Sequence, residues 1–332
     1  MSAPTHLDLF SGAGLFSAGL VQAGFEPVLA VELGAEAVAS YRRNVSRCAV
    51  HGSVADFRGA PKVDVVIAGP PCQGFSTLGR RDPTDVRNAL GLLILPWVRA
   101  ADPSLVVIEN VPPFLRSPQW RELAAGLREL GYADVVTWEL DALDFGVPQR
   151  RRRAFTVASR LGPVAQPAPT TATPRTASSA LFAPGLDKAD PMHVWPTPKG
   201  IAADRIALIP PLGDKRDLLR GHPHLCPPSW SKIADQATDV WGRIDPDKPS
   251  NTVRCNFQNP SKGRYLHPTE NRTLSLREGA RLQGVPDSWC FEGKPLPAAR
   301  QIGNGVPIPM AHAVGESLRA ALAGMGVTAL AA

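Results

Sequence analysis

The stretch that most constrains this chain is GPPCQGFS at residues 69–76. It follows the apolar run Val63–Ala68, whose length and composition predict a buried strand. Gly69 and two prolines end that strand, and because proline fixes φ and stops a helix from starting, we expect Cys72 on a stiff loop at the strand's carboxyl end. Open α/β sheets bind ligands at this edge, where a thiol can act as an exposed nucleophile. The competing interpretation of the same residues is a free cysteine in a proline-rich turn.

Composition limits the class of protein. The chain has 332 residues, room for two domains, and 44% of them are hydrophobic, enough for a normal core. Its formal net charge of +6 suits a polyanionic partner such as nucleic acid, although a merely soluble basic protein has the same charge. Five scattered cysteines indicate a reducing cytosol rather than a disulfide framework, so we expect a cytoplasmic protein. The start of the chain lacks a signal-peptide pattern, and the longest apolar stretch, Leu90–Val98, is too short to span a bilayer.

The first 160 residues alternate between strand and helix patterns, which predicts an α/β fold with a mostly parallel sheet covered by helices on both faces. Strands are expected near 5–10, 27–32, 63–68, 104–109, 134–140 and 153–158, and helices near 14–23, 34–46, 88–100 and 119–130. Residues 162–184, rich in Pro, Ala, Thr and Ser, indicate a linker or mobile loop, and residues 185–260 indicate irregular or short-strand structure. Helices return at 274–283, where Ser275 and Glu278 have capping-box spacing, and at 309–322.

Further polar and glycine-rich blocks stand beside these elements. They are DLFSGAG at 8–14, Glu32, ENV at 109–111, QRRRR at 149–153 and QIGNGVP at 301–307. Together with GPPCQGFS, and in this order, they resemble the DNA (cytosine-5) methyltransferase family from residue 7 to about 320, while about 161–245 has no motif to match. The resemblance implies an S-adenosylmethionine-dependent, Rossmann-like catalytic and cofactor-binding domain at 1–160. It further implies a smaller, irregular or β-rich target-recognition domain with its linker at 161–298, and a C-terminal segment, 299–332, that returns to the catalytic domain.

The resemblance also assigns the chemistry. Cys72 would add to carbon-6 of cytosine, because the ring becomes nucleophilic at carbon-5 only after that addition. Glu109, kept protonated by burial, would donate to nitrogen-3, and Arg153 would hold oxygen-2. Arg151 would support the loop or the carboxylate. A solvated basic run and a surface glutamate at a strand end are the competing interpretations of these residues.

Alternation along an extended chain puts Arg151 and Arg153 on one face, with Arg150 and Arg152 on the other, where they suit phosphates or solvent. The methyl donor implied by the resemblance is S-adenosylmethionine. Glycines allow a tight turn and close approach to it, but Ser17 stands where a dinucleotide-binding pattern needs a third glycine. The residues expected to bind the donor are Phe10, Gly12, Gly14, Glu32, Ser53, Val54, Pro71 and Asn304. The family often has glycine at the position of Leu15 and an acid at that of Ser53, which leaves open whether Ser53 or Asp56 contacts adenine.

A target cytosine must leave the duplex to reach such a site, and the segment after Cys72 suits a closing loop. The residues expected to contact DNA in that loop and in the polar stretch 254–264 are Gln73, Ser76, Arg80, Arg254, Asn256, Gln258, Lys262 and Arg264. The side chains expected to hold phosphates in the middle segment are Lys188, Arg205, Lys215, Arg216, Arg220 and Lys232. The HPHLC segment, His222–Cys226, has no usual zinc spacing, so no metal is expected.

The sequence therefore predicts a monomeric enzyme that makes 5-methylcytosine in a specific sequence of double-stranded DNA. Pairing with a restriction endonuclease is expected from the resemblance alone. An RNA cytosine-5 methyltransferase of the same fold remains an alternative, as does a non-catalytic DNA-binding relative, although a pure binder has no use for Cys72, Glu109 and Arg153 together. A nicotinamide-dependent oxidoreductase is disfavoured by the glycine pattern.

Overall fold

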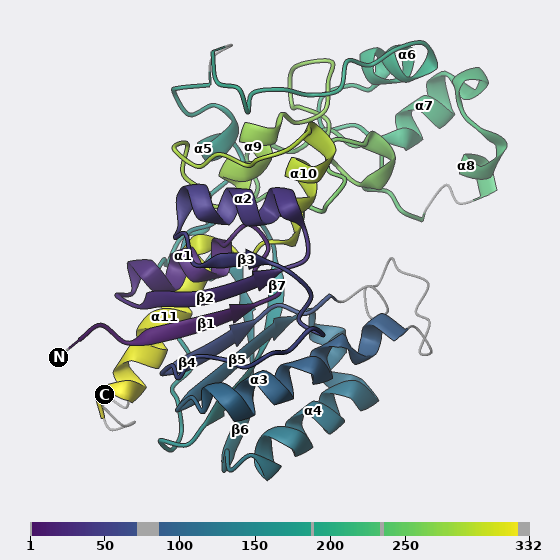
Figure 1. Ribbon diagram of the computed structural model, residues 1–332. Coiled ribbons are helices and arrows are strands. Elements are labelled where there is room, and N and C mark those ends of the chain that lie inside the picture. Colours follow the sequence, from purple (N-terminus) through teal and green to yellow (C-terminus); the bar gives the residue numbers. More distant parts are fainter. Residues whose placement is uncertain (1, 72–85, 187–188, 233–235, 325–332) are drawn as a thin grey trace. The chain divides into compact units, whose positions relative to one another are not determined.

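The computed structural model describes residues 2–71, 86–186, 189–232 and 236–324 (Figure 1). The chain forms two compact units. The first comprises residues 1–145, 152–172 and 305–332, and the second comprises residues 146–151 and 173–304. The chain thus enters the second unit after residues 145 and 172 and leaves it after residues 151 and 304, whereas the sequence predicts boundaries at 160 and 298.

The first unit is built on a seven-stranded sheet in the order β3-β2-β1-β4-β5-β7-β6. Strands β1 to β5 pair in parallel, whereas β7 is antiparallel to both of its neighbours, β5 and β6. The strands are β1 Thr5–Leu9, β2 Glu26–Glu32, β3 Ala49–His51, β4 Val65–Ala68, β5 Leu105–Asn110, β6 Asp134–Asp141 and β7 Arg152–Ser159. The mostly parallel sheet is confirmed. Strand β3 was not predicted, because three residues are too few for a period-two pattern.

Helices cover both faces of this sheet (Figure 1). The helices of the first unit are α1 Leu15–Gln22, α2 Ala35–Asn44, η1 Val86–Leu93, α3 Ile94–Ala101, η2 Pro112–Arg116, α4 Pro118–Glu129, η3 Ala142–Phe145 and α11 Ile308–Leu322. Side chains of β1 show the two faces. Leu7 and Leu9 pack in one core cluster with Trp97 of α3, whereas Asp8, between them, accepts a hydrogen bond from Ser17 of α1.

The last helix of the first unit, α11, packs against α1. The approach is close: a Cβ placed on Gly19 would lie 2.3 Å from the Cβ of Ala311. The predicted helix at 88–100 consists of two parts, the 3₁₀ helix η1 and the α-helix α3 that follows it. Pro96 lies in the first turn of α3, where its missing N–H leaves no hydrogen bond unmade.

The second unit is irregular, as one of the two alternatives predicted. Its helices are short: α5 Ser178–Leu181, α6 Ile201–Leu208, α7 Lys215–Gly221, η4 Pro223–Leu225, α8 Pro228–Lys232, η5 Pro260–Lys262, α9 Leu276–Leu282 and α10 Pro295–Asn304. In the described part of this unit, β pairing is limited to isolated bridges such as Arg243 with Leu266. The predicted capping box is present, since Ser275 and Glu278 bond each other's backbone N–H at the start of α9.

Among the described residues, no helix has both the length and the apolar character needed to cross a membrane.

Candidate active site

The carboxyl ends of four parallel strands meet along one edge of the first unit's sheet. The loop 10–14 follows β1, Glu32 ends β2, Gly69–Pro71 follow β4, and Glu109 lies near the end of β5. Ligands of open α/β sheets bind at this edge, so the fold itself brings these predicted residues together.

The Glu32 carboxylate is held by two backbone donors. The N–H of Gly12 donates to Oε2 at 2.9 Å, and the N–H of Gly34 donates to Oε1 at 2.7 Å. Each carboxylate oxygen keeps a further lone pair, so the group can still accept hydrogen bonds from vicinal hydroxyls such as those of a ribose.

The loop between β1 and α1 has an unusual backbone. Phe10, Gly12 and Gly14 all have positive φ, of 57°, 54° and 88°. Such a conformation is costly for Phe10, and strain of this kind gathers at ligand sites. The hydroxyl of Ser11, in the same loop, is buried and finds no hydrogen-bond partner among the described residues. A polar ligand at this edge would supply that partner, a feature that sequence reasoning missed because it shows only in the packing.

Glu109 and Arg153 form an ion pair beside this loop. Arg153 Nε lies 2.8 Å from Glu109 Oε1, and the two side chains are 13% and 11% exposed. The antiparallel pairing of β7 with β5 explains the contact, because it sets the first residues of β7 beside the last residues of β5. An adjacent guanidinium favours the ionised carboxylate, whereas the sequence predicts a protonated acid in the presence of the base.

The chain that leads to Cys72 is anchored at the same place. Asn110 Nδ2 donates to the carbonyl of Pro70 at 3.4 Å, and a Cβ on Gly69 would lie 3.7 Å from Glu109 Oε2. Pro70 is buried and Pro71 is exposed. Cys72 itself lies outside the described residues, as do Gln73, Ser76 and Arg80. Asn110 is a second residue whose part in the site only the structure reveals.

Two further predicted donor-binding residues follow β3. Ser53 Oγ accepts a hydrogen bond from the N–H of Ala55, so this hydroxyl supports the turn. Val54 is buried, and its carbonyl accepts from Trp97 Nε1 at 2.9 Å. Asp56 is exposed. The choice between Ser53 and Asp56 for adenine therefore remains a prediction.

Arg151 belongs to the second unit and is almost wholly buried there. Its Nη1 donates to Val253 O at 3.0 Å and its Nη2 to Gly303 O at 2.8 Å. Gln149 extends this anchor, since its Oε1 accepts from the N–H of Val253 and its Nε2 donates to Leu282 O. Arg151 thus holds two distant segments of the second unit side by side. The neighbouring Arg152 is exposed and pairs with Glu139.

Asn304 ends α10 in the second unit and has an exposed side chain. Its Oδ1 accepts a hydrogen bond from Cys255 Sγ at 2.7 Å. Gly303 packs directly on the backbone of residues 254 and 255, where a Cβ would come within 2.3 Å of Cys255 N. The QIGNGVP block and the polar stretch 254–264 are therefore neighbours within this unit.

The residues predicted to contact DNA from 254–264 differ in their contacts. Arg264 donates to Leu212 O, Gly213 O and Arg243 O, and pairs with Asp214, so its guanidinium builds the unit itself.

Gln258 likewise donates to the carbonyls of Val194 and Leu274. Arg254 donates to Lys262 O, which closes the loop between them. Asn256 and Lys262 have exposed side chains on this loop.

The residues of the middle segment predicted to bind phosphates also fall into two groups, buried or stacked cations and exposed ones. Lys215 is fully buried, where its Nζ donates to Gln236 O, and Arg205 lies over the rings of Trp230 and Trp241. Buried or stacked cations of this kind support the fold rather than face a solvated backbone. Arg220 is mostly exposed, although it pairs with Asp217. Lys188 lies outside the described residues.

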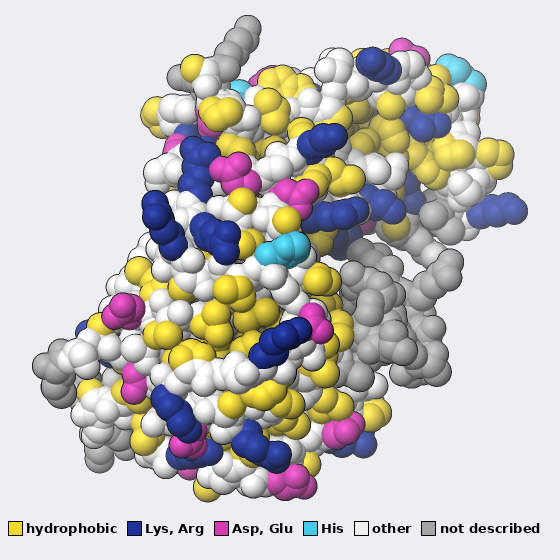
Figure 2. Space-filling view, viewed as in Figure 1, with side chains coloured by type: hydrophobic (Ala, Val, Ile, Leu, Met, Phe, Trp, Pro, Cys, Tyr) yellow, Lys and Arg dark blue, Asp and Glu magenta, His cyan; other side chains and the backbone are white. Residues whose placement is uncertain are grey.

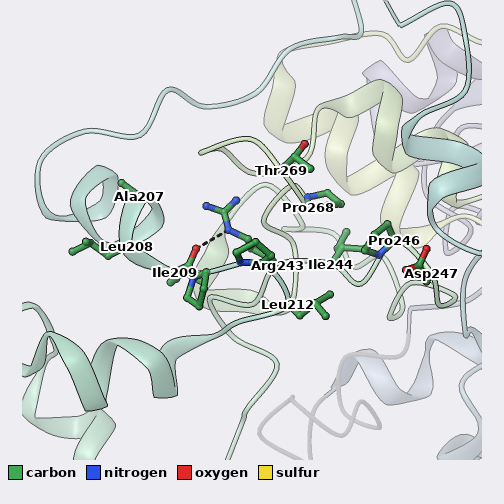
Figure 3. A pocket seen from close by; sticks show the side chains of 12 residues that line it. Ala207, Leu208, Ile209, Leu212, Arg243, Ile244, Pro246, Asp247, Pro268 and Thr269 are labelled. Atoms are coloured by element: carbon green, nitrogen blue, oxygen red, sulfur yellow. Dashed lines mark hydrogen bonds between the residues drawn. The ribbon is translucent and has the colours of Figure 1, made fainter.

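A cavity of about 640 Å³ opens in the second unit (Figure 3). The cavity is mainly apolar and is lined by residues 207–212 and by Ile244, Pro246 and Pro268. Figure 2 shows further hydrophobic side chains on the surface around α6. Arg243, which also lines it, is buried and donates to the carbonyls of Ile206, Ile209, His267 and Glu270. None of the residues predicted for catalysis or donor binding lines this cavity, so its position does not identify the active site.

Comparisons with known proteins agree on one family. The profile of the C-5 cytosine-specific DNA methylases matches residues 5–190 and 221–320. The Type II methyltransferase M1.HphI of Haemophilus parahaemolyticus is 31% identical over 95% of this chain and 86% of its own length. M.XorII of Xanthomonas oryzae is 32% identical over 97% of this chain and 86% of its own. Among solved structures, the methyltransferase EhMeth of Entamoeba histolytica shares the fold, with a TM-score of 0.70 at 14% identity over 97% of this chain and 99% of that one.

Proposed function

This chain belongs to the C-5 cytosine-specific DNA methylase family, and from that premise we propose that it transfers a methyl group from S-adenosylmethionine to carbon-5 of a flipped-out cytosine in a specific duplex sequence. It is a DNA (cytosine-5) methyltransferase by descent. The methyl donor, the extruded base and the covalent step are our proposals. The main observation in support of these proposals is the Glu109–Arg153 ion pair, which lies beside Gly69 in the segment just before Cys72.

Cys72 is the nucleophile in this proposal. Its thiolate bonds to carbon-6, and the displaced electron pair moves toward nitrogen-3 and oxygen-2, which leaves carbon-5 able to attack an electrophilic methyl group. Carbon-5 takes the methyl group and the donor leaves as a thioether. A base then removes the carbon-5 proton, and the electron pair of that bond re-forms the carbon-5–carbon-6 double bond and expels Cys72 as a thiolate. Supporting evidence is the anchoring of Pro70 by Asn110, which fixes the residue two places before the cysteine.

Glu109 and Arg153 stabilise the negative charge that develops on the ring. The carboxyl hydrogen-bonds at nitrogen-3, and the guanidinium donates at oxygen-2. Their ion pair orients both groups before the base arrives, so little reorganisation is needed when charge develops. The Glu109 carboxylate takes up a proton as the base enters, since a neutral carboxyl is needed to donate to nitrogen-3.

S-adenosylmethionine, when bound, supplies the methyl group as a sulfonium. The residues at the sheet edge fit it. Glu32 has lone pairs for the ribose hydroxyls, and the glycines let the ligand approach the backbone. The Ser11 hydroxyl, which has no hydrogen-bond partner in the described part of the chain, suits the polar methionine part. Phe10 and Pro71 are proposed to contact the adenine and the methionine part, and the backbone of Val54 is proposed to contact the adenine. Asn304 is proposed to complete the pocket.

DNA binding is proposed for the second unit and for the segment 73–80. Asn256 and Lys262 are the preferred contacts, because their side chains are exposed, whereas Arg264 and Gln258 bond to the unit's own backbone. Domain boundaries follow the two compact units, with catalysis in the first and target recognition in the second. The named Type II relatives support a role as the modification partner of a restriction endonuclease.

The decisive experiment uses duplex DNA that contains 5-fluorocytosine, which cannot lose a proton at carbon-5. With S-adenosylmethionine present, we expect a covalent protein–DNA adduct whose peptide contains Cys72. Cys72→Ser should form no adduct yet bind S-adenosylmethionine normally. Absence of any adduct with the wild-type protein on duplexes of its own target sequence would refute the mechanism. Bisulfite sequencing of DNA from expressing cells, with RNA as the second arm, identifies the target and tests the RNA alternative.

A further inference from the structure

A buried polar network joins three elements of the first unit at one hydroxyl. Ser17 Oγ donates to Asp8 Oδ2 at 2.6 Å, and it accepts from the hydroxyl of Tyr41 at 2.8 Å. His6 Nε2 lies 2.9 Å from the same oxygen. A hydroxyl has one proton and two lone pairs, so these three partners fill its capacity, and His6 must carry its proton on Nε2. All four side chains are at most 1% exposed.

The network lies next to the loop between β1 and α1. Ser17 is in the first turn of α1. This helix begins directly after Gly14, a residue whose φ is 88°. The ring of Tyr41 fills the space beside that glycine, because a Cβ on Gly14 would lie 2.7 Å from Tyr41 Cδ2. Tyr41 therefore limits the loop sterically and bonds the helix that follows it.

The same network is also connected to a second loop, residues 32–34, which carries Glu32. Tyr41 belongs to α2, which begins after Gly34, and Gly34 supplies one of the two N–H donors to the Glu32 carboxylate. The other donor, Gly12, lies in the loop before α1. Gly34 is thus the N-cap of α2, and Gly12 lies two residues before Gly14, the N-cap of α1. A hydrogen bond between Ser17 and Tyr41 joins these two helices.

We propose that Ser17, together with Tyr41 and Asp8, is a positioning site that fixes the loops 10–14 and 32–34 relative to each other and thereby sets the affinity for the methyl donor. The inference rests on the proposed function, in which these loops bind S-adenosylmethionine. All three side chains are buried and offer no surface to a ligand. They act through the backbone that presents the glycines and Glu32.

The protonation state of the network depends on pH. Burial raises the pKa of Asp8 to about 8, the hydrogen bond from Ser17 opposes this, and the charge of Glu32 adds to it. Burial lowers the pKa of His6 to about 3, and burial together with Asp8 raises the pKa of Tyr41. Asp8 is therefore the member that titrates near neutral pH.

Ionisation of Asp8 adds a second negative charge that interacts with the Glu32 carboxylate, so we expect the pH dependence of donor affinity near pH 8 to differ between the wild-type protein and Asp8→Asn. Cys48, beside Tyr41, is the other titratable group that interacts with the network. The donor's own amine titrates in the same range, so the informative quantity is the difference between the wild-type protein and Asp8→Asn, which carries no charge.

The test is calorimetric titration of S-adenosylmethionine into wild-type protein, Ser17→Ala and Tyr41→Phe. Ser40→Ala is the matched control, since Ser40 is equally buried on α2 but its hydroxyl donates to Glu36 O in its own helix. We expect the dissociation constant to rise roughly tenfold in the first two variants and to stay within about twofold in the control. KM for the donor should rise likewise, while kcat at saturating donor and KM for DNA stay unchanged.

Tyr41→Phe keeps the ring beside Gly14, so it tests the hydroxyl even if Ser17→Ala fails to fold. Donor affinity equal to that of Ser40→Ala in both folded variants would overturn the inference, as would identical pH profiles of wild-type protein and Asp8→Asn. If the wild-type protein binds no donor at all, the proposed function fails and this inference with it. If it binds donor and the variants bind it equally, only the positioning role fails.

Discussion

Arg153 of β7 and Glu109 of β5 form an ion pair with 2.8 Å between Nε and Oε1, at the edge of the sheet where β4 and β5 end. The two residues are far apart in sequence, and they meet because β7 runs antiparallel to β5. Both side chains are largely shielded from water, so their charges interact more strongly than a surface pair would.

The first prediction concerns this pair. Glu109→Gln and Arg153→Met should each lower kcat by about 10²- to 10⁴-fold, because each removes a group that meets developing charge on the base. Arg152→Met is the matched control, since Arg152 precedes Arg153 but pairs with Glu139 at an exposed site, and its turnover should be near that of the wild-type protein. Single-turnover methylation measures the effect, and unchanged rates in the first two variants would exclude their catalytic roles.

The second prediction separates backbone strain from crowding in the loop after β1. Gly12→Ala and Gly14→Ala both force alanine into positive φ, at a cost of about 1–3 kcal/mol each. Only Gly14→Ala also collides with Tyr41 and Val45, whereas a Cβ at Gly12 meets no atom within 4 Å among the described residues. Urea unfolding should therefore show a larger loss of stability for Gly14→Ala, and equal losses would contradict the close packing of Tyr41 and Val45 against Gly14.

The third prediction is a change in the pH dependence of stability. The folded-state pKa of Asp8, about 8, lies above its ordinary value of 3.8, so the folded protein binds the extra proton between these values. Unfolding free energy should thus decrease as pH rises from 4 to 8, by at most about 1.4 kcal/mol per pH unit from this group.

Asp8→Asn removes that contribution. The variant should gain on the wild-type protein steadily from pH 5 to pH 8, as measured by urea unfolding at several pH values. His6, whose pKa is lowered to about 3, contributes the opposite slope below pH 6.5, but it is present in both proteins and cancels in the difference. A difference that does not vary with pH would show that Asp8 does not titrate in this range.

The fourth prediction distinguishes two basic residues of the polar stretch 254–264. Lys262→Ala should leave stability unchanged within about 0.5 kcal/mol and reduce the salt dependence of DNA binding by about one unit of slope. Arg264→Ala should instead destabilise the protein, because its guanidinium bonds three carbonyls and Asp214. Thermal unfolding and DNA titrations at several salt concentrations measure both. The assignment would be wrong if Arg264→Ala kept full stability while losing DNA affinity.

The order of the motifs and the period of the apolar runs were sufficient to predict the strands that carry the site. Val65–Ala68 and Leu105–Asn110 are continuous buried runs, and such runs report central strands without any knowledge of the partner strand. Because parallel strands end at one sheet edge, the sequence also predicted that Glu32 and Glu109 lie at that edge. The apolar runs and the residues at their ends are local features, and local features can be recognised from the sequence alone.

Tertiary structure alone decided what the polar side chains bind. The sequence could not distinguish Arg264, which bonds carbonyls of its own unit, from Lys262, which is exposed, since both are basic residues in one polar stretch. It could not pair Arg153 with Glu109, or bring Tyr41 to Ser17, because those contacts depend on how separate elements pack. The sequence determined which chemical groups this protein has, and folding decided their partners, because a hydrogen bond depends on distances that only the packed chain defines.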